Sequence, residues 1–318
     1  MTIIFFGSSE FSLAALRACL ENSHQVLLVI TTPDKPKGRG LKLTPTPVRQ
    51  YCREKGIPVE APQTLKDPLG LAKVEQLQPD LFVVSSYGKM IPASWLKVPA
   101  KLALNVHPSL LPRYRGAAPI NWPILNGDQE TGITIAEVTS QLDSGDIFYQ
   151  ERIPLDLSID AETLSHQLAQ RSYPALQAVF KKIAEGSLSR TPQEDAAASY
   201  ARKLTKEDAK LSLEKPAAIL DRFIRGLKPW PGSFIFFNQT PLHILKAQPL
   251  AAPLTQKPGT LLEIGNDGSI SLATGEGILK VFRVQPAGKK EMAAADFVRG
   301  RHLTPGFVFE SSPGAATG

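Results

Sequence analysis

Cysteine is scarce in this chain, and long apolar runs are absent. Cys19 and Cys52 are the two cysteines among 318 residues, and they form no C-x-x-C or Cys/His motif. We therefore expect neither a disulfide framework nor a metal site, and a reducing compartment fits this composition. No apolar stretch approaches the roughly 18 residues of a membrane span, and MTIIFFGSSEF lacks the basic flank and cleavage site of a signal peptide. These absences favour a cytoplasmic protein with no membrane partner.

Glycines are also missing where a dinucleotide would need them. The chain begins with an apolar strand (Thr2–Phe6), apolar residues at helical spacing from Phe11 to Cys19, and a second apolar strand (Gln25–Thr32). This order predicts a Rossmann-like start. The first turn, however, reads G-S-S-E-F and lacks the second and third glycines that let a backbone approach a pyrophosphate. A dinucleotide-dependent oxidoreductase is therefore disfavoured.

Positive charge is concentrated in one early segment. The formal net charge is +6, and residues 34–53 hold six basic residues against one acidic residue. Four prolines and two glycines from Thr32 to Pro47 predict irregular structure rather than a helix or a strand. Long loops in compact domains are often functional, although most basic clusters are only solvated surface. We expect a basic loop over residues 33–47, followed by a short helix from Val48 to Lys55.

A polar pair stands at the end of a buried strand further along the chain. The apolar run from Leu102 to Val106 predicts this strand, and Asn105 and His107 lie two residues apart at its downstream end. Because side chains alternate along a strand, both should lie on one face, about 6 to 7 Å apart. Pro108 then ends the ladder. Ligands of open α/β sheets bind at the carboxyl ends of strands, so the pair indicates a site.

An aspartate follows the next predicted strand. Residues 131–140 are expected to form this strand, which continues into L-D-S-G-D with Asp143. An aspartate before Ser-Gly commonly only caps backbone amides. It could also reach the imidazole of His107. We therefore expect three side chains from two neighbouring strand ends to converge.

Taken together, N-x-H-P-S-L-L-P from Asn105 and L-D-x-G-D from Leu142 resemble the 10-formyltetrahydrofolate-dependent formyltransferases. Residues from Ile3 to about Glu185 look like that family's catalytic domain. The downstream half and the basic segment resemble the members that act on methionyl-tRNA, so the resemblance covers nearly the whole chain. It implies that the catalytic residues are Asn105, His107 and Asp143.

The same resemblance implies two binding surfaces. The residues expected to border the folate are Ser86, Tyr87, Gly88, Ser109, Leu110, Leu111 and Pro112. The residues expected to contact tRNA are Lys35, Lys37, Arg39 and Lys42. On its own, Tyr87 is equally well explained as an aromatic residue at a strand end. Contacts to tRNA phosphates would make binding salt-dependent.

The pattern of apolar and polar residues changes after residue 188. Residues 189–208 are polar without apolar periodicity and predict a linker. Beyond them, one helix (Pro216–Leu227) and a succession of short strands predict a small OB-like β-barrel. The five expected strands are Ser233–Phe237, Leu242–Ala247, Gly259–Ile264, Ser269–Ala273 and Gly277–Val284.

The expected fold class is α/β, with a mostly parallel sheet in a Rossmann-like catalytic domain and an OB-like barrel after it. The expected organisation is a catalytic domain over 1–188, a linker over 189–208, a tRNA-binding domain over 209–310 and a tail over 311–318. Within the first domain, helical spacing extends from Ala161 to Glu185. Pro174 lies inside this helix and predicts a kink or a break into two helices.

The implied reaction moves a formyl group from 10-formyltetrahydrofolate to the α-amine of methionyl-tRNA. The amide of Asn105 and a protonated His107 would stabilise the tetrahedral oxyanion, and Asp143 would orient His107. No metal and no covalent enzyme intermediate are required, and we expect a monomer.

Two other interpretations remain open. A formyltransferase for a small amine, such as glycinamide ribonucleotide or an amino sugar nucleotide, would share the three residues without needing the basic loop or the barrel. A non-catalytic RNA-binding module would explain the loop and the barrel but not the three residues.

Overall fold

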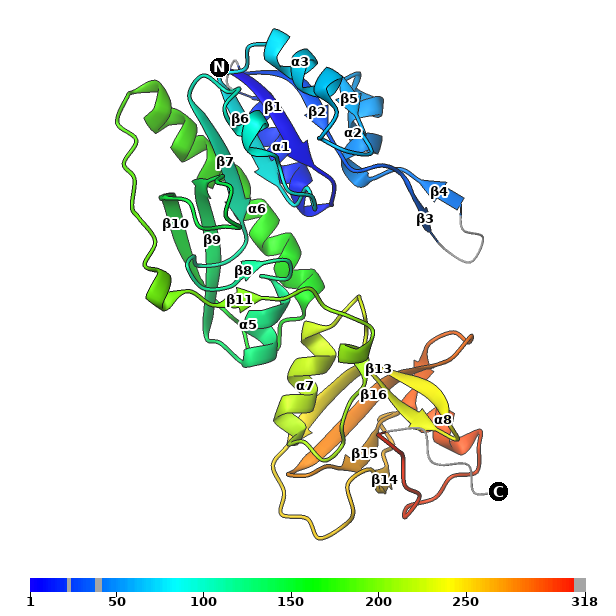
Figure 1. Ribbon diagram of the computed structural model, residues 1–318. Helices are drawn as coiled ribbons and strands as arrows, with labels where there is room; N and C mark the ends of the chain where they lie inside the picture. Colours follow the sequence, from blue (N-terminus) through cyan, green and yellow to red (C-terminus); the bar gives the residue numbers. More distant parts are fainter. Residues whose placement is uncertain (22–23, 38–41, 312–318) are drawn as a thin grey trace. The chain divides into compact units, whose positions relative to one another are not determined.

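The computed structural model describes residues 1–21, 24–37 and 42–311, which divide into two compact units (Figure 1). The first unit comprises Met1–Ile120, Glu130–Leu155 and Leu164–Arg202. The second unit comprises Asn121–Gln129, Asp156–Thr163 and Lys203–Gly318. Each unit contains its own sheet and its own apolar core.

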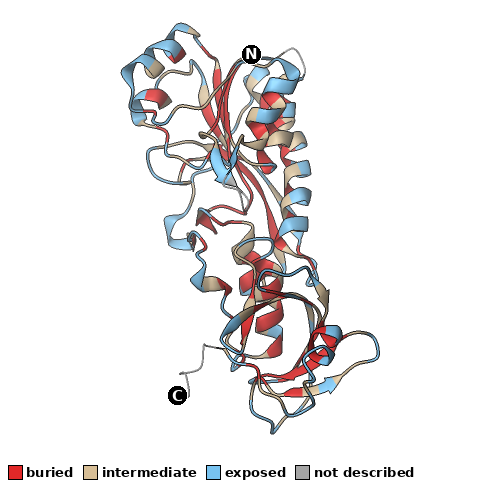
Figure 2. Cartoon of the chain, turned by 90° about the vertical axis from the view of Figure 1, so that its right-hand side faces the viewer, coloured by how far each residue is buried: buried red, intermediate tan, exposed pale blue. Residues whose placement is uncertain are grey.

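The first unit is built on a seven-stranded sheet with the order β10-β9-β7-β6-β1-β2-β5. Its strands are β1 (Thr2–Gly7), β2 (Gln25–Ile30), β5 (Val59–Glu60), β6 (Leu81–Ser85), β7 (Leu102–His107), β9 (Glu130–Glu137) and β10 (Ile147–Pro154). Five neighbouring strands of this sheet run parallel, namely β7, β6, β1, β2 and β5. Strand β9 is antiparallel to both β7 and β10. Figure 2 shows that buried residues follow these strands. The mostly parallel sheet of the expected α/β class is confirmed.

The helices of the first unit include one, α2, whose start is fixed by a side-chain cap. These helices are α1 (Phe11–Leu20), α2 (Pro47–Lys55), α3 (Pro68–Gln76), α4 (Ala93–Leu96) and most of α6 (Ala161–Ala184). The start of α2 is capped because the side chain of Thr46 accepts a hydrogen bond from the backbone N–H of Arg49, and a proline occupies the first helical position. Across the described ranges, no helix has both the length and the apolar character that crossing a membrane requires.

Pro174 does not divide α6, so the alternative of two separate helices is wrong. Proline removes one backbone donor and crowds the preceding turn. Leu168 before it, and Ala175 and Leu176 after it, are all fully buried. Tertiary packing on both sides of the proline therefore keeps this stretch helical, as packing commonly outweighs local propensity.

The basic segment contains a small hairpin, which corrects the expectation of wholly irregular structure. Strands β3 (Lys35–Lys37) and β4 (Lys42–Thr44) pair antiparallel, with Pro36 opposite Leu43. A two-stranded ribbon tolerates a proline because each strand has one edge that forms no ladder. Lys35 and Lys42 are exposed on it. Arg39 lies outside the described residues.

The second unit contains a curled antiparallel sheet with the order β12-β13-β16-β15-β14, and β17 pairs with β16. Its strands are β12 (Phe234–Phe237), β13 (Thr240–Leu250), β14 (Leu261–Ile264), β15 (Ile270–Ala273), β16 (Ile278–Pro286) and β17 (Met292–Ala293). Its helices are α5 (Asn121–Asn126), α7 (Ala217–Gly226) and α8 (Ala294–Arg299). All five predicted strands and the helix before them are present. The two short elements β17 and α8 were not expected.

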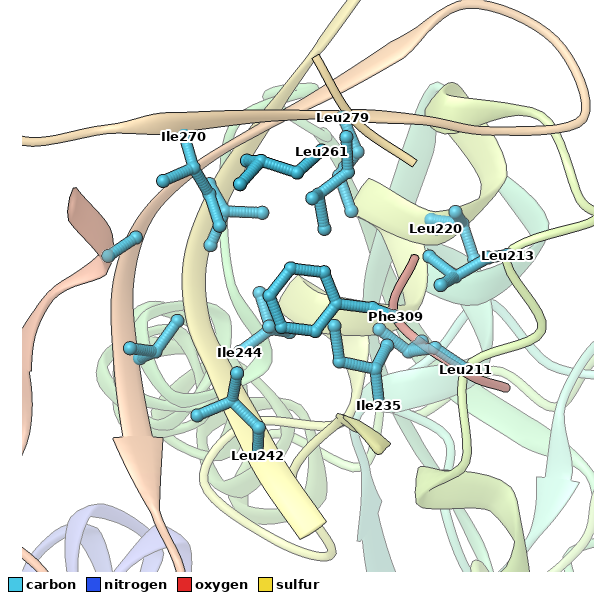
Figure 3. Close-up of a cluster of buried hydrophobic side chains, with 14 of the residues drawn as sticks. Leu211, Leu213, Leu220, Ile235, Leu242, Ile244, Leu261, Ile270, Leu279 and Phe309 are labelled. Carbon is cyan, nitrogen blue, oxygen red and sulfur yellow. The ribbon is translucent and has the colours of Figure 1, made fainter. Parts of the chain in front are cut away.

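The core of the second unit lies inside this curled sheet. Leucine, isoleucine and phenylalanine side chains from the strands meet those of α7 and of the segment around Phe309 (Figure 3). Phe309 is only 2% exposed. The sheet therefore forms the half-barrel architecture expected of an OB-like domain.

Candidate active site

Two of the predicted residues project from one face of β7. Asn105 Nδ2 lies 2.9 Å from Asp143 Oδ1, and His107 Nδ1 lies 3.7 Å from Asp143 Oδ2. The side chains of His107 and Asp143 are only 5% and 10% exposed. The alternation of side chains along the strand therefore brings the amide of Asn105 and the imidazole of His107 next to the same carboxylate, as the sequence predicted.

Asp143 arrives by a different route from the one expected. Because β9 is antiparallel to β7, its last residue Glu137 pairs with Leu104, away from the carboxyl end of β7. Residues 138–146 then form a loop, which closes where the Glu137 N–H donates to the Asp146 carbonyl (2.9 Å). This loop returns Asp143 to the middle of β7. The three residues converge, but the two strand ends do not share one edge of the sheet.

The carboxylate of Asp143 is held from two sides. Its Oδ1 accepts from Asn105, and its Oδ2 accepts from the backbone N–H of Gly116 at 2.8 Å. Gly116 belongs to β8 (Arg115–Gly116), which pairs with β11 (Tyr200–Ala201). A Cβ on Gly116 would lie 2.8 Å from the Ala201 carbonyl oxygen, and its φ of +117° favours glycine. This close approach explains why a glycine donates here.

The hydrogen-bond partners of His107 define the roles of its two ring nitrogens. Nε2 lies 2.9 Å from the carbonyl oxygen of Tyr114. A carbonyl oxygen only accepts, so Nε2 carries the hydrogen of this bond. Nδ1 is consequently the ring nitrogen that faces Asp143. Any proton exchange with a substrate here would use Nδ1.

The segment predicted to border the folate from the β7 side is firmly anchored. Ser109 is fully buried, and its hydroxyl donates to the Arg113 carbonyl at 2.7 Å. Thr134 on β9 donates to the Ser109 carbonyl at 2.6 Å and accepts from the Leu111 N–H at 3.3 Å. Leu110 and Leu111 are buried as well. These bonds fix the backbone through Pro112 next to the three converging residues.

The other predicted folate residues follow β6, the parallel neighbour of β7. Ser86 and Gly88 are exposed with φ values of +46° and +81°. Tyr87 is buried, and its ring packs edge-on against Phe6 with 5.5 Å between ring centroids. Burial raises the pKa of Tyr87 to about 12. The Tyr87 ring therefore belongs to the core, and the exposed groups at this position are those of its two neighbours.

Three of the four predicted tRNA residues lie on the β3–β4 hairpin, and Arg39 falls outside the described residues. Lys35 and Lys37 are in β3 and Lys42 is in β4. At the base of the hairpin, Arg49 of α2 forms an ion pair of 2.6 Å with Asp34. This ion pair ties the chain before the hairpin to the helix after it.

Sequence reasoning missed one residue that contacts the site. Gln193 lies in the segment predicted as a linker, yet its side-chain amide donates to the carbonyl oxygens of Asp143 and Gly145 at 2.9 and 2.7 Å. Its oxygen accepts from the buried Arg115. A glutamine in a polar stretch carries no local signal of such a role, because all three of its partners lie far away in the sequence.

The arrangement suits group transfer by stabilisation of charge and movement of protons. An amide donor and an imidazole meet at one largely buried carboxylate, where low solvent access strengthens electrostatic interactions. Neither cysteine provides a nucleophile, because both are buried, and burial raises the pKa of the Cys52 thiol to about 11. In the described ranges, no cluster of histidine, cysteine or acidic residues could hold a metal ion. The fold and the site thus define an α/β protein suited to group transfer by acid–base and oxyanion chemistry.

Comparison with known proteins identifies the family. Residues 1–180 match the family model described as formyl transferase, and residues 203–302 match that of the formyl transferase C-terminal domain. A methionyl-tRNA formyltransferase of Geobacter metallireducens is 38% identical over 306 residues, which cover 96% of this chain and 97% of the relative. One of Caldanaerobacter subterraneus is 37% identical over 311 residues, with coverage of 98% and 100%. The chain belongs to the formyl transferase family.

Solved structures share the fold. The sugar 3N-formyl transferase WlaRD matches with a TM-score of 0.65 at 19% identity, over 91% of this chain and 99% of that one. HypX from Aquifex aeolicus, in complex with tetrahydrofolic acid, matches with a TM-score of 0.62 at 17% identity. That match covers 94% of this chain and 47% of HypX. These likenesses confirm the architecture of the formyltransferase fold.

Proposed function

We propose that the chain transfers the formyl group of 10-formyltetrahydrofolate to the α-amino group of methionyl-tRNA. The observation that carries the proposal is the convergence of Asn105 and His107 on Asp143. It occurs in a chain that matches methionyl-tRNA formyltransferases along nearly its whole length. We further propose that the enzyme acts in the cytoplasm, and that it acts as a monomer.

The residues divide the chemistry between them. An α-amino group has an ordinary pKa of about 7.7 to 8.0 and must be neutral to attack the formyl carbon. The attack forms the new C–N bond and a tetrahedral oxyanion, and the second hydrogen of Asn105 Nδ2 is available to stabilise it because the first binds Asp143. The bond from the formyl carbon to the folate nitrogen then breaks. That nitrogen receives the proton which the amine gives up, by way of Asp143, His107 or water.

Binding is proposed to use the surfaces on either side of these residues. The folate would border the exposed turn at Ser86 and Gly88, with Tyr87 as its core anchor, and the fixed backbone from Ser109 through Leu110 and Leu111 to Pro112. The basic residues Lys35, Lys37 and Lys42 of the hairpin, together with Arg39, would contact tRNA phosphates. The exposure of Lys35 and Lys42 supports this assignment.

A direct assay tests the proposal. The protein is mixed with 10-formyltetrahydrofolate and methionyl-tRNA, and formylmethionine is measured after the ester is hydrolysed. Glycinamide ribonucleotide and an amino sugar nucleotide serve as rival acceptors in parallel reactions. Asn105→Ala is the matched variant, and loss of one oxyanion donor should lower kcat by about 100- to 1000-fold. Formylation of a small amine but not of the tRNA would overturn the assignment, as would a normal kcat in the Asn105 variant.

A further inference from the structure

The segment that follows α6 returns to the candidate active site and contacts both of its loops. Thr191 pairs with Ile147, just after the loop that carries Asp143, with N···O distances of 2.8 and 2.9 Å. Further along, β11 pairs with β8, the strand that contains Gly116. Between these two contacts lies Gln193. Residues 191–201, named here the site strap, therefore lie against both pieces of backbone that hold Asp143.

The side-chain amide of Gln193 is fully used in this arrangement. Its nitrogen donates to the carbonyl oxygens of Asp143 and Gly145, at 2.9 and 2.7 Å. Its oxygen accepts from Nε and Nη2 of Arg115, at 3.1 and 3.0 Å. Two donors and two acceptor positions are all that a primary amide offers. No other side chain of this length supplies two donors on one branch and an acceptor on the other.

These four bonds connect the two structures that determine where the Asp143 carboxylate lies. Asp143 has a φ of +52°, a left-handed conformation that is uncommon outside glycine and needs support from its surroundings. Gln193 binds the carbonyl oxygen of that same residue. At its other end it binds Arg115, whose neighbour Gly116 donates to the Asp143 carboxylate. Arg115 is only 4% exposed, so its two bonds to Gln193 also satisfy a largely desolvated cation.

We propose that Gln193 is a positioning residue for formyl transfer: it holds the backbone of Asp143 and the Gly116 donor in register, so that the carboxylate stays beside His107. This inference rests on the proposed function, since it assigns a role in that same site. Gln193 touches neither Asn105 nor His107 in any of the bonds described, so it acts through Asp143. Its loss should therefore lower the rate of the chemical step more than the affinity for either substrate.

Two substitutions at Gln193 and one matched control test the inference. Gln193→Glu keeps the shape and the bonds to Arg115, but it turns a carboxylate oxygen toward two carbonyl oxygens. Gln193→Met keeps the length without charge or hydrogen bonds, and it serves if the first variant folds poorly. The control is Gln177→Glu in α6, because Gln177 also donates its side-chain N–H to a backbone carbonyl, that of Ala18, at 2.9 Å. Each variant is compared with the wild type for kcat, for KM of both substrates and for melting temperature.

Both Gln193 variants should lower kcat by about 10- to 100-fold and change each KM by less than about threefold, because a misplacement near 1 Å is enough for such a loss. Gln177→Glu should lose stability without losing kcat. Unchanged kcat in both Gln193 variants would overturn the inference. So would a loss of kcat in the Gln177 control that matches theirs, since the effect would then follow general stability.

A second measurement does not depend on turnover. The Gly116 amide proton donates to Asp143, so its hydrogen exchange should be faster in Gln193→Glu than in the wild type and unchanged in Gln177→Glu. Equal exchange in all three proteins would refute the positioning role. A wild-type protein that formylates nothing would refute the proposed function instead, and the exchange result would still decide whether Gln193 supports this loop.

Discussion

A single methyl group at position 145 should separate Asp143 from its partners. A Cβ built on Gly145 would lie 2.1 Å from the carbonyl oxygen of Glu137, whereas real contacts of this kind do not fall below 3.0 Å. The loop must therefore move by about 0.9 Å, and the obstacle is backbone rather than a flexible side chain. Asp143 lies two residues before the point of collision and must move with it.

The expected cost of Gly145→Ala follows from that displacement. Misplacing a catalytic group by about 1 Å lowers turnover by roughly 100-fold. The crowding itself should reduce the free energy of unfolding by about 1 to 3 kcal/mol. Initial rates of methionyl-tRNA formylation give kcat, and urea unfolding gives the stability of the same preparation.

Gly70→Ala is the matched control, because it adds the same methyl group where space allows it. A Cβ there would meet the Trp95 ring at 3.6 Å, an ordinary van der Waals contact. Within α3, alanine should raise stability by about 0.5 to 1 kcal/mol over glycine and leave kcat unchanged. If Gly145→Ala kept wild-type kcat, the close packing of this loop would not be what places Asp143.

Three further outcomes are expected. Replacing Lys35 and Lys42 together by alanine should reduce the slope of log affinity for tRNA against log salt by roughly one unit per lost phosphate contact. An unchanged slope would remove the hairpin from the tRNA surface. Burial raises the pKa of the Cys52 thiol to about 11 and also raises that of Cys19, so iodoacetamide at pH 8 should label neither residue until urea unfolds the protein. Rapid labelling of the native protein, read by mass spectrometry, would contradict this. Phe309→Ala should destabilise the second unit by about 3 to 5 kcal/mol in urea unfolding, because its ring fills the centre of that core.

Local patterns were sufficient to predict much of the fold. The apolar runs of β1, β2, β6 and β7 predicted buried strands because both faces of a parallel sheet are covered. In the second unit, turn sequences such as Asn-Asp-Gly mark the boundaries of short strands. The shared face of Asn105 and His107 follows from strand geometry alone.

Other features depend on contacts between distant residues and left no local trace. An apolar run such as β9 does not encode its direction relative to its neighbour, so the return path of Asp143 could not be read from the sequence. The strand β11 exists because it pairs with Arg115 and Gly116, not because its own residues favour it. The count of prolines misled the reading of residues 33–47, since Pro36 sits at an edge where it costs no hydrogen bond.

The site strap has a consequence for recombining this chain with its relatives. It completes the surroundings of Asp143 and then continues at Lys203 into the second unit. A chimaera joined at residue 188, where the composition changes, would combine a glutamine from one parent with the arginine and aspartate loops of the other. A junction placed after Arg202 would inherit all three from one parent, so crossovers at that point should yield active hybrids far more often.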